Sequence, residues 1–66
     1  MEVTINGNTH HLDKPCTVQD LIEYLDIATK RFAIEINKEL IPRSSFATHP
    51  IQNGDKIEVV GAIGGG

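Results

Sequence analysis

The first 12 residues alternate between apolar and polar side chains. Val3 and Ile5 stand between polar neighbours, which is the two-residue period of a strand with one buried face. The turn signal Asn6-Gly7 follows, and this dipeptide readily adopts the positive φ angles of a tight hairpin. We therefore predict a β-hairpin over residues 1–12. Its second strand ends before Pro15, because proline lacks the N–H donor that a strand needs.

Residues 17–25 change to the spacing of an amphipathic helix. Their apolar positions fall at i, i+3, i+4 and i+7 and form one stripe: Val18, Leu21, Ile22 and Leu25. Thr17 precedes the stripe and Asp20 stands three residues later, in the pattern of a capping box. The sequence contains no second helix of comparable length, so we expect this stripe to pack against a sheet.

Three further strands are predicted, over residues 32–37, 40–41 and 56–60. Pro42 ends the short middle strand, and Asn53-Gly54-Asp55 supplies a turn before the last one. Between these, Ser44 or Ser45 is a candidate cap for a brief helical turn that contains Phe46.

This order of elements predicts an α+β fold, with a mixed sheet of four to five strands and one main helix across it. We expect one domain over residues 1–63 and a flexible glycine tail over residues 64–66. The predicted core comprises Val3, Ile5, Leu12, Val18, Leu21, Ile22, Leu25, Phe32, Ile34, Ile36, Phe46, Ile57 and Val59. A filled layer of this kind leaves no room for a substrate pocket of several hundred Å³.

Composition and charge exclude several classes of function. The chain has 66 residues, a formal net charge of −3 and six scattered Lys and Arg residues, which argues against nucleic-acid binding by phosphate neutralisation. No apolar run approaches the roughly 18 residues that span a membrane. Cys16 is the single cysteine, so no internal disulfide can form. A lone thiol without a signal peptide predicts a cytoplasmic protein.

Few side chains are candidates for chemistry. Cys16 is near a helix start, where a thiol can become reactive, but we favour its interpretation as a small apolar residue. His10 and His11 are adjacent on a strand and should point to opposite faces, while His49 is remote, so we predict no metal site.

The three glycines at residues 64–66 stand apart from the rest. Glycine-rich ends can be linker remnants or frayed termini, and this interpretation stays open from the residues alone. A tail without side chains can also thread a narrow channel and place a carboxylate in the active site of another protein. That carboxylate is ionised at neutral pH and must be activated before a nucleophile can attack it. ATP would supply this activation as an acyl-adenylate, and the carrier itself would need no catalytic residue.

The sequence resembles the ThiS family of sulfur carriers in thiamine biosynthesis, which are ubiquitin-like β-grasp proteins. The resemblance covers essentially the whole chain. It rests on the helix "TVQDLIEYL", the segment "AIEINKELIPRSSF" and the end "NGDKIEVVGAIGGG".

The resemblance implies a function that depends on partner enzymes. An adenylating enzyme, ThiF, would activate the carboxylate of Gly66 with ATP and Mg²⁺, and Gly64 and Gly65 would form the flexible lead. A sulfur donor such as a cysteine desulfurase would then convert the adenylate to a thiocarboxylate. The thiazole synthase ThiG would accept that sulfur. The protein itself would be a carrier rather than an enzyme, with no bound cofactor.

Two alternatives stay open besides an enzyme that uses Cys16. One is the MoaD-like small subunit of molybdopterin synthase, and the other is a β-grasp interaction module without covalent chemistry. For partner docking, we name the apolar residues that the layer facing the helix does not need: Ile41, Val60, Ala62 and Ile63. The competing interpretation is that one or more of these residues complete the core.

Overall fold

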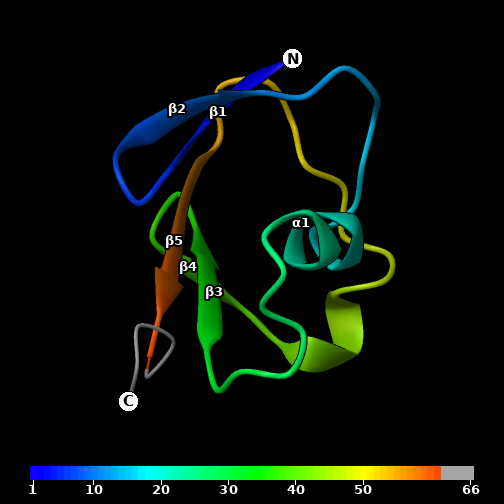
Figure 1. The fold of residues 1–66 in the computed structure, drawn as a ribbon, viewed down its shortest axis with the longest axis vertical. Coiled ribbons are helices and arrows are strands. Elements are labelled where there is room, and N and C mark those ends of the chain that lie inside the picture. Colours follow the sequence, from blue (N-terminus) through cyan, green and yellow to red (C-terminus); the bar gives the residue numbers. More distant parts are fainter. Residues whose placement is uncertain (62–66) are drawn as a thin grey trace.

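The computed structural model describes residues 1–61 of the chain, and Figure 1 shows the arrangement of its elements. In chain order these are β1 (Glu2–Ile5), β2 (Asn8–His11), α1 (Val18–Tyr24), β3 (Ala33–Ile36), β4 (Glu39–Ile41), the 3₁₀ turn η1 (Arg43–Ser45) and β5 (Lys56–Val60). The strands agree with the predicted ones to within one residue at most ends. Ala62, Ile63 and the predicted tail of Gly64, Gly65 and Gly66 lie outside the described residues.

All five strands form one mixed sheet in the order β2-β1-β5-β3-β4. β1 pairs parallel with β5 at the centre, while the remaining neighbours are antiparallel. The parallel pair requires a crossover, and the chain between β1 and β5 contains α1, which lies on one side of β3 and β5 (Figure 1). The predicted α+β fold with one helix across a mixed sheet is therefore confirmed.

The start of α1 follows the predicted capping box. The Thr17 backbone N–H donates to the Asp20 carboxylate at 2.9 Å, and the Asp20 N–H donates to the Thr17 hydroxyl at 3.2 Å. These two bonds satisfy donors that the first helical turn cannot pair internally. At the other end, Leu25 is the C-cap and Asp26 adopts a left-handed φ of 58°, which turns the chain back toward the sheet.

The core lies between α1 and the sheet and contains twelve of the thirteen predicted residues. The exception is Leu25, which is only partly buried because it sits at the helix C-cap. Three residues that were not predicted are buried as well: Ile27, Ile41 and Ile51. Ile27 returns to the core directly after the left-handed turn at Asp26, where its N–H donates to the Ile22 carbonyl.

The short helical turn differs from its prediction. η1 covers Arg43–Ser45, its N-cap is Pro42, and no side chain caps it, so neither Ser44 nor Ser45 has the predicted role. The fixed φ of proline suits the entry to a helical turn without a side-chain acceptor. Phe46 follows at the C-cap and is 5% exposed, which confirms its predicted place in the core.

Candidate functional site

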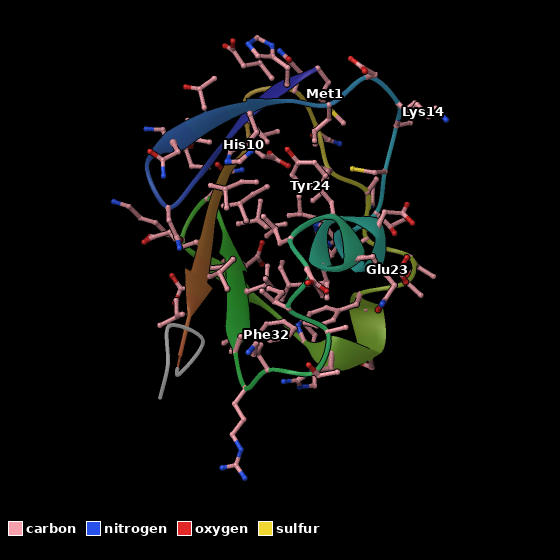
Figure 2. The ribbon with its side chains drawn as sticks, viewed as in Figure 1. Met1, His10, Lys14, Glu23, Tyr24 and Phe32 are labelled. Carbon is pink, nitrogen blue, oxygen red and sulfur yellow. The ribbon has the colours of Figure 1, made fainter. Side chains whose placement is uncertain are left out.

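The predicted reactive residue lies beyond β5, so the described part of the site is the end of that strand. Val60 is paired with Ala33 at the start of β3, and Gly61 is the last residue that the structure describes. This end of β5 lies beside Phe32 and on the opposite side of the molecule from Met1 (Figure 2). The described chain therefore ends at Gly61, next to the segment that enters β3.

Two asparagine side chains hold β5 from both sides. The Asn6 amide bonds both backbone groups of Val59, with its oxygen 2.8 Å from the Val59 nitrogen. The Asn37 amide oxygen accepts from the Lys56 N–H at 3.0 Å, and its nitrogen donates to the buried carboxylate of Asp55. Both asparagines have left-handed φ angles, which this residue type tolerates. The strand that leads to the tail is thus fixed at its start and near its end.

Gly61 occupies a position where any side chain would be strained and crowded. Its φ is +132°, a backbone region that side chains rarely allow. A Cβ atom added at Gly61 would lie 2.9 Å from the Arg31 carbonyl oxygen and 3.0 Å from the Phe32 Cα, and both of these are backbone atoms. A glycine here allows the chain to pass closely over the segment that enters β3.

That segment is in turn held by Arg43. The Arg43 guanidinium donates to the Phe32 carbonyl at 3.1 Å and lies 4.9 Å from the centre of the Phe32 ring. It also lies 5.9 Å from the Phe46 ring, which stacks on Phe32. A cation over two aromatic faces, with a hydrogen bond to the backbone, fixes the place where Gly61 packs. Sequence reasoning gave Arg43 no role, because its partners are remote in sequence.

Of the four predicted docking residues, the structure describes Ile41 and Val60, and these two differ in solvent exposure. Ile41 is 5% exposed and belongs to the core, so the competing interpretation is correct for this residue and it cannot dock a partner. Its side chain faces α1 because its register partner Ile34 does. Val60 is 47% exposed and remains a candidate. Ala62 and Ile63 lie outside the described residues.

Sequence reasoning missed a second exposed apolar residue on the same face of the sheet, Leu40, which is 62% exposed. Leu40 lies opposite Glu35, and Glu35 in turn lies opposite Glu58. The register that places the two carboxylates together depends on strands that are distant in the chain, and the sequence pattern contains no direct signal of it.

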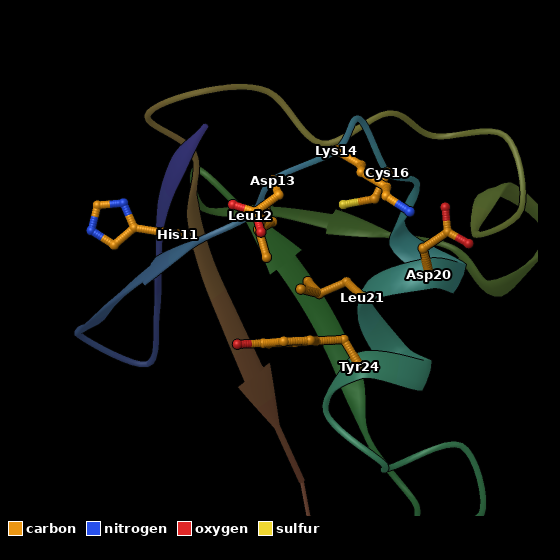
Figure 3. A pocket seen from close by; sticks show the side chains of 8 residues that line it. All are labelled: His11, Leu12, Asp13, Lys14, Cys16, Asp20, Leu21 and Tyr24. Atoms are coloured by element: carbon orange, nitrogen blue, oxygen red, sulfur yellow. The ribbon is translucent and has the colours of Figure 1, made fainter.

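Cys16 lies at the rim of a surface hollow near the other end of the sheet (Figure 3). The hollow has a volume of about 300 Å³, larger than the sequence analysis allowed, and is lined by His11, Leu12, Asp13, Lys14, Cys16, Asp20, Leu21 and Tyr24. Its lining comes from the end of β2, the loop that follows it and α1. Burial raises the pKa of the Cys16 thiol, and the nearby Asp20 carboxylate raises it further. Both effects disfavour the nucleophilic thiolate.

The histidines take separate places. His10 contacts the Tyr24 hydroxyl of α1 at 3.2 Å (Figure 2). His11, the next residue along β2, pairs with its register partner Glu2 instead. Among residues 1–61, no three His, Cys, Asp or Glu side chains are grouped to hold a metal ion. Within the same residues, no helix is long and apolar enough to cross a bilayer.

Comparison with known proteins gives consistent results. Residues 3–66 match the sequence model of the ThiS family. The chain is 33% identical to the sulfur carrier protein ThiS of Escherichia coli, and the match covers both proteins completely. It is also 38% identical to a thiazole synthase of Paramagnetospirillum magneticum, but it spans only 20% of that protein's length.

A solved structure agrees with the fold. The crystal structure of the thiamine biosynthesis protein ThiS from Geobacter metallireducens matches over 100% of both chains, with a TM-score of 0.84 and 29% sequence identity. The predicted ubiquitin-like β-grasp architecture is confirmed by this match together with the observed sheet order.

Proposed function

The chain belongs to the ThiS family, and from this premise we propose that it is a sulfur carrier in thiamine biosynthesis. The observation that carries the proposal is the family match over residues 3–66, which includes the glycines of the tail. The complete coverage of the Escherichia coli sulfur carrier supports it. In this role the protein is a co-substrate of other enzymes, and its own fold serves to present the tail.

The proposed reaction takes place at the carboxylate of Gly66. A ThiF-type enzyme with ATP and Mg²⁺ joins this carboxylate to AMP and releases pyrophosphate. Hydrosulfide attacks the acyl carbon, the C–S bond forms, and the C–O bond to AMP breaks. A persulfide donor gives an acyl disulfide instead, which a thiol then cleaves to release the thiocarboxylate while the thiol and the donor cysteine become a disulfide. The product is a thiocarboxylate, whose sulfur is passed to the acceptor. The described residues contribute by fixing β5 and by starting the tail at Gly61, beside β3.

We propose a ThiG-type thiazole synthase as the acceptor. Two thiazole synthases each contain a segment similar to the whole of this chain, which makes up 20% of their length. A carrier segment in the same polypeptide as its acceptor would place the two at high effective concentration. This arrangement supports thiazole rather than pterin as the destination of the sulfur. A cysteine desulfurase is the proposed source of the sulfur.

Intact-mass spectrometry tests the proposal. The protein is incubated with a purified ThiF-type enzyme, ATP, Mg²⁺ and sodium sulfide, and the enzyme is first shown to be active on its own carrier. We expect a mass change that corresponds to the exchange of one oxygen for sulfur, located at Gly66 by fragmentation. A variant that lacks Gly65 and Gly66 should remain unchanged. An unmodified wild-type protein under these conditions would exclude the sulfur-carrier function.

The same deletion separates the carrier from a non-covalent interaction module. Transfer is measured by adding a ThiG-type synthase with its other substrates and assaying the thiazole product. A sulfur carrier should lose formation of the thiazole product completely when Gly65 and Gly66 are removed. A non-covalent interaction module should support the same amount of product with and without these two glycines. Product from a molybdopterin precursor, but not from the thiazole synthase system, would favour the MoaD-like alternative.

A further inference from the structure

The sequence contains two Asn-Gly pairs, Asn6-Gly7 and Asn53-Gly54, and both lie in turns. Asparagine is a thermolabile residue, because the backbone nitrogen of the next residue can attack its side-chain carbonyl carbon. Glycine as the next residue makes this attack easiest, since it has no Cβ to shield its nitrogen. Each pair is therefore a candidate for spontaneous deamidation, and the two pairs differ in the contacts that hold them.

The reaction at the second pair consumes one water molecule and releases one ammonia molecule, without oxidation or reduction. The Gly54 nitrogen bonds to the Asn53 Cγ and loses its proton, and the bond from Cγ to the side-chain nitrogen breaks to release ammonia. Water then opens the five-membered succinimide at either carbonyl, which leaves aspartate or isoaspartate. The isoaspartate product carries one extra backbone carbon in the turn that precedes β5.

Both reacting groups of Asn53-Gly54 are held by the backbone of one residue, Glu2. The Glu2 N–H donates to the Asn53 side-chain oxygen at 2.8 Å, and the Gly54 N–H donates to the Glu2 carbonyl at 2.7 Å. Glu2 is the first residue of β1, and its register partner His11 lies on the edge strand β2 (Figure 1). The register of β1 with β5 begins only at Thr4. Detachment of this strand end therefore breaks few contacts and frees both reacting groups.

Asn6 is held instead by the central part of the sheet. Its side-chain amide bonds both backbone groups of Val59, at 2.8 and 3.4 Å, and its N–H donates to the Ile57 carbonyl at 2.9 Å. Val59 is buried in β5, which lies between β1 and β3, and its register partner Ile34 is buried as well. Release of Asn6 therefore requires opening of the sheet at its centre, an event close to global unfolding.

We propose that Asn53 is a deamidation site of the native protein, opened by local detachment of Glu2, and that Asn6 is protected until the protein unfolds. The same dipeptide then reports two different opening events in one molecule. Aspartate at position 53 can still accept from the Glu2 N–H, whereas isoaspartate lengthens the turn and loses the geometry in which Gly54 bonds the Glu2 carbonyl. The isoaspartate form should therefore be the less stable product.

Peptide mapping by mass spectrometry, during incubation at mildly alkaline pH, measures deamidation at both sites in the same sample. We expect the native protein to react about tenfold faster or more at Asn53 than at Asn6, which corresponds to a difference of about 1.4 kcal/mol in opening free energy. In concentrated guanidinium chloride the two rates should become similar, because the dipeptide is the same. Equal rates in the native protein, or faster reaction at Asn6, would overturn the proposal.

Substitution of Glu2 tests whether this residue controls the reaction. Glu2→Pro removes the N–H that bonds Asn53 and is compatible with the first residue of a strand, whereas Glu2→Gln keeps that N–H and is the matched control. We expect Glu2→Pro to raise the rate at Asn53 several-fold while Asn6 stays slow, and Glu2→Gln to match the wild type. A folded Glu2→Pro protein with an unchanged rate at Asn53, or with equal increases at both sites, would contradict the control by Glu2. If Glu2→Pro does not fold, the two native rates in the wild type still decide.

Discussion

The side-chain amide of Asn6 makes two hydrogen bonds to the backbone of Val59, as a further residue of β1 would if the strand continued. The amide oxygen accepts from the Val59 N–H at 2.8 Å, and the amide nitrogen donates to the Val59 carbonyl at 3.4 Å. Asn6 itself lies in the turn after β1 with a φ of 51°, and its own N–H donates to the Ile57 carbonyl. One residue thus closes the hairpin turn and extends the contact of β1 with the strand that leads to the tail.

Asn6→Gly should destabilise the fold, because it removes both side-chain bonds while retaining the left-handed φ. We expect a loss of about 1–2 kcal/mol, since the Val59 N–H would lack a partner. Asn6→Ala should lose about 1–2 kcal/mol more, because alanine adopts left-handed φ at a cost. Urea denaturation measures both. Asn6→Asp keeps the acceptor for the Val59 N–H and serves as the control. A glycine variant as stable as the wild type would show that the two Asn6–Val59 hydrogen bonds do not stabilise the fold.

Gly61→Ala should lower both the free energy of unfolding and the adenylation of Gly66. The added Cβ would contact the Arg31 carbonyl oxygen at 2.9 Å, in addition to the strain of a φ of +132°. Gly54→Ala is the matched control, because Gly54 also has a positive φ but has open space around its Cβ position. We expect Gly61→Ala to cost about 1–3 kcal/mol beyond the loss in the control. Adenylation of Gly66 should fall in the Gly61 variant alone, and equal effects in both variants would contradict the close approach.

Arg43→Met should loosen the segment on which Gly61 packs. The substitution keeps much of the apolar stem but removes the bond to the Phe32 carbonyl and the cation over the two rings. We expect a loss of about 1–2 kcal/mol in thermal or urea unfolding, with Arg43→Lys intermediate. Arg31→Met changes an exposed arginine nearby and should be almost neutral. If the two methionine variants are equally stable, the aromatic contacts of Arg43 contribute little.

The sequence predicted those features that depend on neighbours along the chain. The Asn6-Gly7 turn, the capping box of Thr17 and the alternation in β5 are local signals, and the structure confirms all three. The burial of Ile51 could not be predicted in this way. Ile51 stands beside an isolated bridge between Thr17 and Pro50, and its N–H donates to the Cys16 carbonyl, so its burial depends on a contact across more than thirty residues.

The surroundings of the candidate site depend even more on contacts between residues that are distant in the sequence. Val60 was predicted because it is apolar and the layer facing the helix does not need it, whereas the neighbours that define its surroundings come from other strands. Glu35 and Glu58 oppose each other only because β3 and β5 pair with one particular register, and a shift by one residue would turn each side chain to the other face. The role of Arg43 likewise depends on where Phe32 and Phe46 meet. Single-sequence patterns do not encode such pairings.

Removing one carboxylate of the opposed pair Glu35 and Glu58 should stabilise the isolated protein. Glu58→Gln relieves the repulsion from Glu35, and we expect a gain of about 0.2–1 kcal/mol in the free energy of unfolding at low ionic strength. In 1 M NaCl the gain should nearly vanish, because the Debye length falls to about 3 Å. Urea denaturation at both salt concentrations measures this, with Glu23→Gln as the control. A loss of stability in Glu58→Gln would mean that an internal cation already compensates the pair.

Cys16→Ser should leave the sulfur loading of Gly66 unchanged, because the thiol is not needed in the proposed reaction. Loading is measured by intact mass after incubation with the adenylating enzyme and sulfide. Loss of loading in a folded Cys16→Ser protein would instead support chemistry at this thiol. The substitution is conservative at this position, since Cys16 is only partly buried against the core.

The pH dependence of Cys16 provides a direct test of its environment. Burial, and then the Asp20 carboxylate, raise the pKa of the thiol, so alkylation by iodoacetamide should reach half its maximal rate at a higher pH than in an unstructured cysteine peptide. The folded state then disfavours the thiolate relative to the unfolded chain. The corresponding stability is fully present below the ordinary thiol pKa and is lost as the pH rises through the raised one. Asp20→Asn retains an acceptor for the Thr17 N–H but removes the charge, and it should move the alkylation midpoint downward. A midpoint at or below that of the peptide would show that the helix start activates Cys16 after all.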